Sequence, residues 1–405
     1  MAPRTVTAKA LQALLTRIGS ASSGTKEVLQ ARFKRDVAEQ HLFGQRTGKG
    51  QRKSHPEKLR IISIDMGIKN LAFCDVEVDY VQGNSMKPTL DIIRWDKLNL
   101  VDATHDSLQH QPETPDTQNV KEGTKHAQEE LDPYSLSILS RTAYTFLRKS
   151  ILEVSPDIIL IERQRWRSAS SAAIQQWTVR VNTLEAMLWA ILSALKLEQS
   201  ATAREAKGAI ANRQYDVYGV DPKRVGQFWL GQSARALAEK QDEAIASEGI
   251  DLLGGTVDQT TKKKEPRSKA EKKAKIAIIR SWFANEPAST APSTPASAPI
   301  ISFTVGPRAT TALKALSLPA PKTPRKKKAK AGDDNIIQLL PLVEEKDMKK
   351  LDDITDSCLQ VAAWVAWESN RRQLYDIWAR KRGRNGKMPE LDDEVLKEMI
   401  SVVGE

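Results

Sequence analysis

The sequence predicts a mixed α/β fold, in which parallel and antiparallel strands form one sheet flanked by helices. Three observations predict it. Two apolar strands joined by a short turn span 59–79, a continuously apolar strand spans 157–162, and apolar residues recur at helical spacing over 133–154 and 170–197. The first pair indicates an antiparallel hairpin, whereas a short, continuously apolar strand is typical of a sheet covered on both faces.

Composition excludes several classes of protein. The 405 residues are 40% hydrophobic and 28% charged, which does not fit a collagen-like or wholly disordered chain. No run of about 18 apolar residues occurs, so no membrane span is predicted. Cys74 and Cys358 are the only cysteines, too few for a disulfide framework or a Cys-rich zinc site. The net charge of +11 favours a polyanionic partner, without choosing between DNA, RNA and anionic lipid.

Two short helices are predicted at the start of the chain. Residues 11–18 place leucine and isoleucine at helical spacing, and Gly19 ends that helix. Residues 26–36 carry Val28, Leu29 and Phe33 on the inner side and basic residues on the other. Because residues 1–26 contain no acidic residue, they also fit an amphipathic mitochondrial presequence. Both interpretations are kept for this segment.

The central part of the chain predicts the strands of the sheet and two helices between them. Strands are expected at 59–65, 70–79, 90–95, 157–162 and 215–220. A polar loop over about 102–130 precedes a helix at 133–154, whose buried side would include Leu136. A long helix over about 170–197 follows the fourth strand, with Trp177 and Trp189 expected in the core or in a dimer interface.

The last third of the chain differs from the preceding part in amino-acid composition. Between 262 and 280, nine Lys or Arg residues stand against two acidic residues, and isoleucines indicate a basic helix. Residues 286–324 are rich in Pro, Ala, Ser and Thr, and are not expected to bury enough apolar surface to become ordered. A final helix is expected at 352–370. The predicted organisation is a helix–loop–helix at 1–36, a basic tether at 37–57, a core at 58–253, an insertion at 254–334, a final core helix at 335–372 and an extension at 373–405.

Carboxylates are the candidate catalytic groups. The five histidines are poorly placed for a Ser-His-Asp triad or a His-ligated zinc, because three of them lie in the polar loop. Asp65 and Glu162 each end a strand, and Asp352, Asp353 and Asp356 open the last helix. Acids spaced three or four apart share one helix face. Such a set can hold two Mg²⁺ ions about 4 Å apart, which activate water and stabilise the leaving oxygen of a phosphodiester.

Each acid taken alone has a structural explanation. An Asp after a strand often forms a turn, and an Asp at the start of a helix often caps it. Asp352 fits such a cap, which would leave Asp353 and Asp356 as the metal ligands. The joint placement of the acids favours a metal site over these separate explanations.

Three segments resemble a known family. Residues Ile64–Ala72, Ile161–Arg167 and Lys350–Ser357 resemble the fungal mitochondrial Holliday-junction resolvases, which are RuvC-like members of the ribonuclease H-like superfamily. The resemblance covers about 59–253 and 335–370, and residues 1–36 resemble the SAP-type helix–loop–helix, a small DNA-binding module. The segment 286–324 and the tail 371–405 depart from the family pattern.

The resemblance implies a ribonuclease H-like fold, a mitochondrial location and a homodimer that makes paired symmetric nicks in four-way junction DNA during recombination. By position, it implies that Asp65, Glu162, Asp353 and Asp356 bind metal, with Asp352 as the alternative. Two Mg²⁺ ions per active site, replaceable by Mn²⁺, would be the cofactors, and the products would carry 5′-phosphate and 3′-hydroxyl ends. No membrane and no small-molecule cofactor are implied.

Basic and polar residues beside these acids are candidate DNA ligands, with a solvated surface as the alternative for each. Arginine suits phosphate because it donates two parallel hydrogen bonds, and most such contacts position the DNA backbone. Trp166 would stack on an unpaired base or pack under the long helix. The Lys-rich segments 262–275 and 325–330 would add salt-dependent affinity, or act as tethers or a nuclear address. The candidate DNA ligands are Lys26, Arg32, Lys69, Asn70, Arg163, Gln164, Arg165 and Arg167.

Two other functions are kept open. One is a non-catalytic protein that binds branched DNA, against which the complete set of acids argues. The other is a ribonuclease that acts on RNA–DNA hybrids or structured RNA. A panel of substrates at one salt concentration separates the second from a junction nuclease.

Overall fold

The structure is a computed structural model that describes residues 6–39, 41, 58–79, 88–102, 132–164, 176–205, 215–231, 267–283, 301–317, 351–381 and 392–404. Most of the predicted tether, the polar loop after residue 102, the segment 165–175 and the basic cluster 325–330 lie outside these residues. The predicted domain boundaries stay predictions.

Six strands form one mixed sheet: β1 (Lys58–Asp65), β2 (Leu71–Asp79), β3 (Thr89–Leu98), β4 (Ile158–Glu162), β5 (Asp216–Val220) and β6 (Ser302–Val305). Their order across the sheet is β5-β4-β1-β2-β3-β6. β1 and β3 pair antiparallel with β2, while the β1–β4, β4–β5 and β3–β6 pairs are parallel. The first five strands match the predicted ones, and the mixed α/β fold is confirmed.

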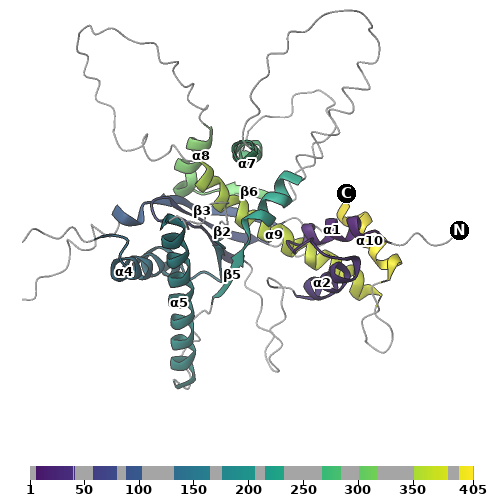
Figure 1. The fold of residues 1–405 in the computed structure, drawn as a ribbon, viewed down its shortest axis with the longest axis horizontal. Helices are drawn as coiled ribbons and strands as arrows, with labels where there is room; N and C mark the ends of the chain where they lie inside the picture. Colours follow the sequence, from purple (N-terminus) through teal and green to yellow (C-terminus); the bar gives the residue numbers. More distant parts are fainter. Residues whose placement is uncertain are drawn as a thin grey trace, which may run out of the picture.

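Helices cover both faces of the sheet. In Figure 1, α4 and α5 lie on one side of it, and α7, α8 and α9 lie on the other. Within the described residues, no helix combines the length and the apolar composition needed to cross a membrane. The helices used below are α1 (Ala8–Arg17), α2 (Lys26–Ala38), α4 (Leu136–Phe146), α5 (Gln176–Glu205), α7 (Arg267–Phe283), α8 (Thr310–Ser317), α9 (Leu351–Arg380) and α10 (Asp393–Gly404).

Alternation along the strands separates two apolar cores. In β4, Ile158 and Leu160 belong to the core under α9, whereas Ile159 and Ile161 belong to the core under α4 and α5. Successive side chains of a strand point to opposite faces, so a strand buried on both faces becomes continuously apolar. This is why the fourth strand carries no polar residue before Glu162.

The N-terminal and C-terminal segments form a third core together. Leu11, Leu15 and Phe33 of α1 and α2 pack with Trp378 of α9 and Met399 of α10. The predicted helix–loop–helix is therefore present, and the last residues of the chain complete its apolar core. Figure 1 shows this α1–α2 module beside the end of α9, away from α4 and α5.

Four local expectations need correction. Val28 of α2, expected on the inner side with Leu29 and Phe33, is 45% exposed, because it lies one position before the buried side of the helix. Residues 301–317, expected not to become ordered, form β6 and α8 and bury Ile301, Ala312 and Leu316. Leu136, expected to be buried, is 67% exposed at the first turn of α4. The final helix runs ten residues beyond the expected end at residue 370, because α9 ends at Arg380 where the α1–α2 module covers it.

Candidate active site

A row of residues crosses the sheet at the end of β1. Asp65 pairs with Ala72 of β2, and Ala72 pairs with Lys97 of β3. Ile64 pairs with Ile161, so Glu162 lies beside Asp65 on the other side. By alternation from buried neighbours, the side chains of Lys97, Asp65 and Glu162 all project on the α9 side of the sheet. Two carboxylates predicted from strand ends therefore meet.

The Asp65 and Glu162 carboxyl groups are close enough to share a hydrogen bond. Burial is the main cause that raises the pKa of Asp65 well above its ordinary value, and the negative charge of Glu162 adds to it. The backbone N–H of Met66 donates to Glu162 Oε2 at 3.2 Å, and Gln164 Nε2 donates to the same oxygen at 3.0 Å. Among the described residues, neither acid has a lysine or arginine partner.

The acidic start of α9 is held against this edge of the sheet by hydrogen bonds from side chains. Trp95 Nε1 donates to the Ile354 carbonyl at 2.9 Å, and Gln360 Nε2 donates to the Ile64 carbonyl at 3.3 Å. The pKa of Asp356 is raised, mainly by burial and further by the charge of Glu162, while Lys275 opposes the rise. Asp353 and Asp356 also raise the pKa of Asp65, so all four predicted acids lie within electrostatic reach of one another.

Lysines pair with the three acids at the start of α9. Lys97 Nζ lies 3.3 Å from Asp353 Oδ2, and Lys275 Nζ lies 2.8 Å from Asp356 Oδ1. Lys272 pairs with Asp352, and this contact raises the pKa of the Lys272 ammonium group. Lys272 and Lys275 both belong to α7, which packs along α9 through Ile279 and other apolar residues.

The chemistry of these residues fits a hard divalent cation, although the described side chains as placed do not include three acids around a single point. Mg²⁺ prefers carboxylate oxygens, and the four acids offer them at the end of two rigid strands and one helix. The buried Asp65–Glu162 pair is a concentration of negative charge that a cation would neutralise. Asp352 pairs with Lys272, which lies three residues before Lys275 in α7, and its role as the alternative ligand stays a prediction.

The predicted DNA ligands are placed differently from one another. Lys69 is exposed and Asn70 is half-buried in the turn that follows Asp65. Gln164 turns back to Glu162, and its backbone N–H donates to Glu185 Oε2 at 2.9 Å. Arg163 is exposed beside Gly219, while Arg165 and Arg167 lie outside the described residues. A DNA contact by any of them stays a prediction.

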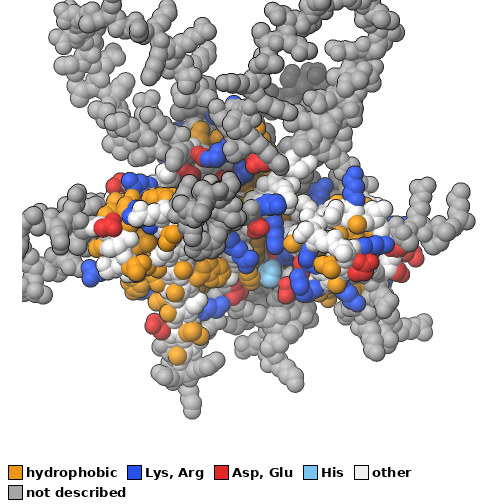
Figure 2. Space-filling model, in the orientation of Figure 1, with side chains coloured by type: hydrophobic (Ala, Val, Ile, Leu, Met, Phe, Trp, Pro, Cys, Tyr) orange, Lys and Arg blue, Asp and Glu red, His pale blue; other side chains and the backbone are white. Residues whose placement is uncertain are grey.

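In the α1–α2 module, Lys26 is the first residue of α2 and is half-buried. Arg32 instead stabilises the loop between the helices, because its Nη1 donates to the carbonyls of Ala21 and Ser23 at 2.6 and 2.8 Å. Figure 2 shows Lys and Arg side chains gathered between the sheet and this module, whereas apolar side chains are dense over α4 and α5.

Sequence reasoning missed Lys97, Lys272 and Lys275. Alternation offered a signal for Lys97, because it follows buried Trp95 by two positions and so shares its face. Nothing local could connect α7 to the acids, because they are about 80 residues apart in the chain.

Comparisons with known proteins agree on one family. Residues 61–374 match the family described as "Mitochondrial resolvase Ydc2 / RNA splicing MRS1". A protein of Schizosaccharomyces pombe named "Cruciform cutting endonuclease 1, mitochondrial" is 31% identical over 197 residues, which cover 47% of this chain. The aligned part spans 62% of that relative's length. A Saccharomyces cerevisiae protein of the same name is 24% identical over 91% of this chain and 83% of its own length.

One solved structure is also similar. The crystal structure of the yeast mitochondrial Holliday junction resolvase Ydc2 aligns with a TM-score of 0.45 and 18% identity. The alignment covers 91% of this chain and 96% of that one.

Proposed function

The chain belongs to the family of the mitochondrial resolvase Ydc2 and the RNA-splicing protein MRS1, and from this premise we propose that it is a Mg²⁺-dependent endonuclease that resolves four-way DNA junctions by paired symmetric nicks. The observation that carries the proposal is the convergence of Asp65, Glu162, Asp353 and Asp356 at one edge of the sheet. The relatives named as mitochondrial cruciform-cutting endonucleases support both the reaction and a mitochondrial location.

The roles of the residues follow from their contacts. Asp65, Glu162, Asp353 and Asp356 would hold two Mg²⁺ ions, with Mn²⁺ as a substitute. Bound ions of this kind supply Lewis-acid charge that activates water and stabilises a leaving oxygen. The Met66 N–H and Gln164 orient Glu162, and Lys69 would contact phosphates beside the site. Cleavage of this type leaves 5′-phosphate and 3′-hydroxyl ends.

We also propose that the active form is a homodimer. A four-way junction is nearly two-fold symmetric, so a two-fold dimer presents one active site to each of two opposed strands. Large apolar side chains exposed on α4 and α5 support this proposal, since Leu136, Trp177 and Leu197 are 67%, 41% and 71% exposed. These helices lie on the face of the sheet opposite α9 (Figure 1).

A second candidate function is a non-catalytic nucleic-acid-binding protein, on DNA or on RNA. Two observations favour it. Three of the acids are paired with lysines, and the family description names RNA splicing as well as a resolvase. A ribonuclease acting on RNA–DNA hybrids is a further alternative, and the cleavage assay described next distinguishes it from a junction nuclease.

The test compares cleavage of a labelled four-way junction, a linear duplex and an RNA–DNA hybrid at one salt concentration. Wild-type protein should nick two opposed junction strands symmetrically with Mg²⁺. Asp65→Asn should lower the cleavage rate by at least about 100-fold while junction binding in Ca²⁺ is retained, because Asn keeps the shape and removes a metal-binding charge. Asp79→Asn, which removes the same charge at the opposite end of the β1–β2 hairpin, should cleave normally.

Three results would contradict the proposal. Preference for the hybrid would make the protein a ribonuclease. Tight junction binding without nicks in Mg²⁺ or Mn²⁺ would make it a binding protein. Equal cleavage by wild type and Asp65→Asn would remove Asp65 from the site.

A further inference from the structure

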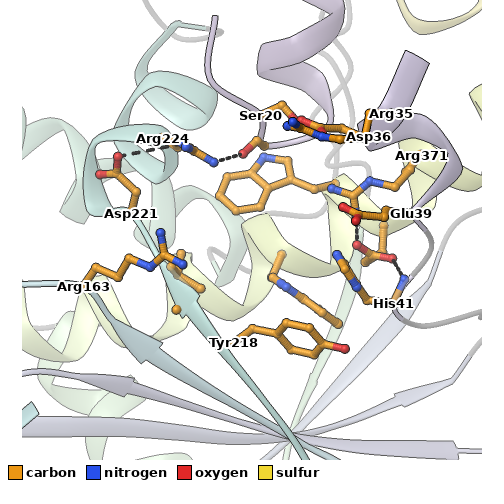
Figure 3. A pocket seen from close by; sticks show the side chains of 16 residues that line it. Ser20, Arg35, Asp36, Glu39, His41, Arg163, Tyr218, Asp221, Arg224 and Arg371 are labelled. Atoms are coloured by element: carbon orange, nitrogen blue, oxygen red, sulfur yellow. Dashed lines mark hydrogen bonds and ion pairs between the residues drawn. The ribbon is translucent and has the colours of Figure 1, made fainter. Parts of the chain in front are cut away.

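A pocket of about 310 Å³ lies between the α1–α2 module, the edge strand β5, the helical segment 222–231 and α9. Figure 3 shows arginine, aromatic and acidic side chains from these elements converging on it. Its size is at the lower end of the range, about 300–1,000 Å³, in which proteins bind small ligands. None of the roles proposed above uses this pocket.

One wall of the pocket is aromatic. The Tyr218 ring lies 5.6 Å from the Trp364 ring and 4.8 Å from the His41 ring, with interplanar angles of 36° and 48°. Burial is the main cause that lowers the pKa of His41, so the ring is neutral at pH 7. Trp367 also lines the pocket, is only 5% exposed, and its indole N–H has no acceptor among the described residues. This wall offers flat apolar surface and one buried donor.

The charges that line the pocket are balanced. Four arginines and four acids line it, and three of the arginines are paired with acids. Arg371 pairs with Glu368, and Arg224 lies 3.8 Å from Asp221 while its Nη1 donates to the Gly19 carbonyl at 3.0 Å. The guanidinium of Arg163 has no hydrogen bond or ion pair within the described part of the chain. Its side chain lies across Gly219, where a Cβ would come within 2.4 Å of Arg163 Nε.

The pocket adjoins the acidic cluster. Val220, which lines the pocket, pairs directly with Glu162 across the β4–β5 ladder. The backbone N–H of Arg163 donates to the Val220 carbonyl at 2.8 Å, so these two strand ends are tied together. Neighbouring strands lie about 4.8 Å apart. The pocket and the predicted metal ligand Glu162 are therefore one strand apart at the same end of the sheet.

We propose that this pocket receives one unpaired nucleotide of the DNA strand bound at the acidic cluster, with its base against Tyr218 and its phosphate on Arg163. The inference rests on the proposed function, since it takes DNA as the ligand. Balanced charge disfavours a polyphosphate and fits a neutral base with one phosphate at the mouth. Aromatic rings bind any base through stacking. Taking a base out of the stack costs least where it is already unpaired, as at the centre of a branched DNA.

The test uses photocrosslinking of the full-length protein. 5-Iododeoxyuridine, which crosslinks to aromatic side chains, is placed in turn at each position near the branch point of a four-way junction and in a short single strand. Binding is measured in Ca²⁺, crosslinked peptides are identified by mass spectrometry, and cleavage of the same junctions is measured in Mg²⁺. The variants are Tyr218→Leu and Arg163→Ala, and the control is Lys223→Ala, an exposed neighbour of the pocket.

The expected result is a crosslink to His41, Tyr218 or Trp364 at one or two junction positions. Tyr218→Leu and Arg163→Ala should lower single-strand affinity by about fivefold or more, the range measured for loss of one base-stacking contact, and Lys223→Ala should not. Arg163 is exposed, so Arg163→Ala is informative even if Tyr218→Leu fails to fold.

Junction cleavage without any crosslink to the pocket would overturn the inference and leave the proposed function intact. Crosslinks to the pocket from the single strand, in a protein that never cleaves junctions, would support the pocket and reject the proposed function. Equal affinity of all three variants would also overturn the inference.

Discussion

Asp65 and Asp75 are both buried, yet only Asp75 is surrounded by positive charge. Asp75 accepts hydrogen bonds from Arg60 Nε and Nη2 at 2.9 and 2.8 Å and from Arg94 Nε at 2.9 Å. Asp65 faces Glu162 and the acids of α9 instead. A carboxylate with arginine partners stabilises the fold, whereas a cluster of carboxylates weakens it until a cation binds.

Asp75→Asn should therefore destabilise the protein strongly. The variant leaves two largely buried guanidinium groups without their shared anion, and removal of one partner of a buried ion pair costs about 3–5 kcal/mol. Urea denaturation followed by circular dichroism measures the free energy of unfolding. Asp79→Asn, at the end of β2, is the control and should stay within about 0.5 kcal/mol of wild type. A similar value for both variants would show that the arginine pairs contribute little.

Asp65→Asn should have the opposite effect on the metal-free protein. The folded-state pKa of Asp65 lies above its unfolded value, so its contribution to stability is fully present below the unfolded pKa and is lost as pH rises through the folded pKa. The variant does not titrate at this position. Its melting temperature should exceed that of wild type by about 2–4 °C at pH 8, and the difference should shrink towards pH 4.

The control for this prediction is the same pair of melting curves with Ca²⁺, in which wild type should gain stability and Asp65→Asn should gain less. A variant that melts below wild type at every pH would mean that the carboxyl group makes a stabilising hydrogen bond that Asn cannot replace.

At this scale the sequence predicted which acids would lie near one another, because Asp65 and Glu162 end apolar strands and the other acids start a helix. It could not predict the pKa values or the partner lysines, because these depend on the register between strands and on the position of α7. Arg32 shows a different limit of the sequence analysis. Its charge led us to predict a DNA contact, but its guanidinium group donates hydrogen bonds to carbonyls of the loop between α1 and α2.

Among the elements, α7 connects the insertion to the acidic start of α9. The basic composition of 262–280 correctly predicted a helix, but not that its apolar face would pack in the core. Trp282 stacks on Phe303 at 4.8 Å with an interplanar angle of 16°, and Phe303 belongs to β6. β6 is only four residues long, and the aromatic residues that cover it come from α7. Because the residues that cover β6 come from another segment of the chain, the composition of 301–317 alone predicted that this segment would not become ordered.

The lysines of α7 should compete with divalent ions for the acids of α9. Replacing both Lys272 and Lys275 by Gln removes two partly exposed ion pairs of about 0.2–1 kcal/mol each. We expect the affinity for Ca²⁺, measured by isothermal titration calorimetry, to rise severalfold. Lys314→Gln on α8, an exposed lysine of the same insertion, is the control and should leave Ca²⁺ affinity unchanged. Weaker Ca²⁺ binding in the double variant would show that these lysines orient the acids for the metal.

At the scale of the whole molecule, the α1–α2 module is attached to the core around the sheet at a close contact. Gly19 has a φ of +69°, and a Cβ there would come within 2.3 Å of the Trp367 ring. Arg371 Nη2 donates to the Ile18 carbonyl at 2.8 Å, and Asn370 Nδ2 donates to the Arg17 carbonyl at 2.8 Å. The end of α1 is thus fixed on α9 by both packing and hydrogen bonds.

Gly19→Ala should loosen this attachment. The added methyl group meets a buried ring, and the left-handed backbone disfavours alanine, so we expect a loss of about 1–3 kcal/mol in the free energy of unfolding. Gly226→Ala is the control, because nothing lies within 4 Å of its Cβ and it sits in a helical segment. That substitution should be neutral or slightly stabilising. Equal stability of the two variants would mean that the module is held elsewhere.

The sequence predicted the module and the core separately, but not their attachment. The family match ends at residue 374, and nothing in the composition of the tail, 371–405, connected it to α1. Only the structure shows that Leu374 and Met399 fill the same apolar core as Leu11.

Because α9 is one continuous helix, its length fixes the distance between the acidic cluster and the α1–α2 module. The acids Asp353 and Asp356 lie in its first turns, and its contacts with the module begin at Trp367, about 12 residues and about 18 Å later. Duplex DNA rises about 3.4 Å per base pair. If an arm of the proposed DNA substrate lay along the helix, the module would contact it roughly five base pairs from the acids, about half a turn of the duplex. Under the proposed function, the length of this single helix would then set how long an arm must be to reach both the acids and the module.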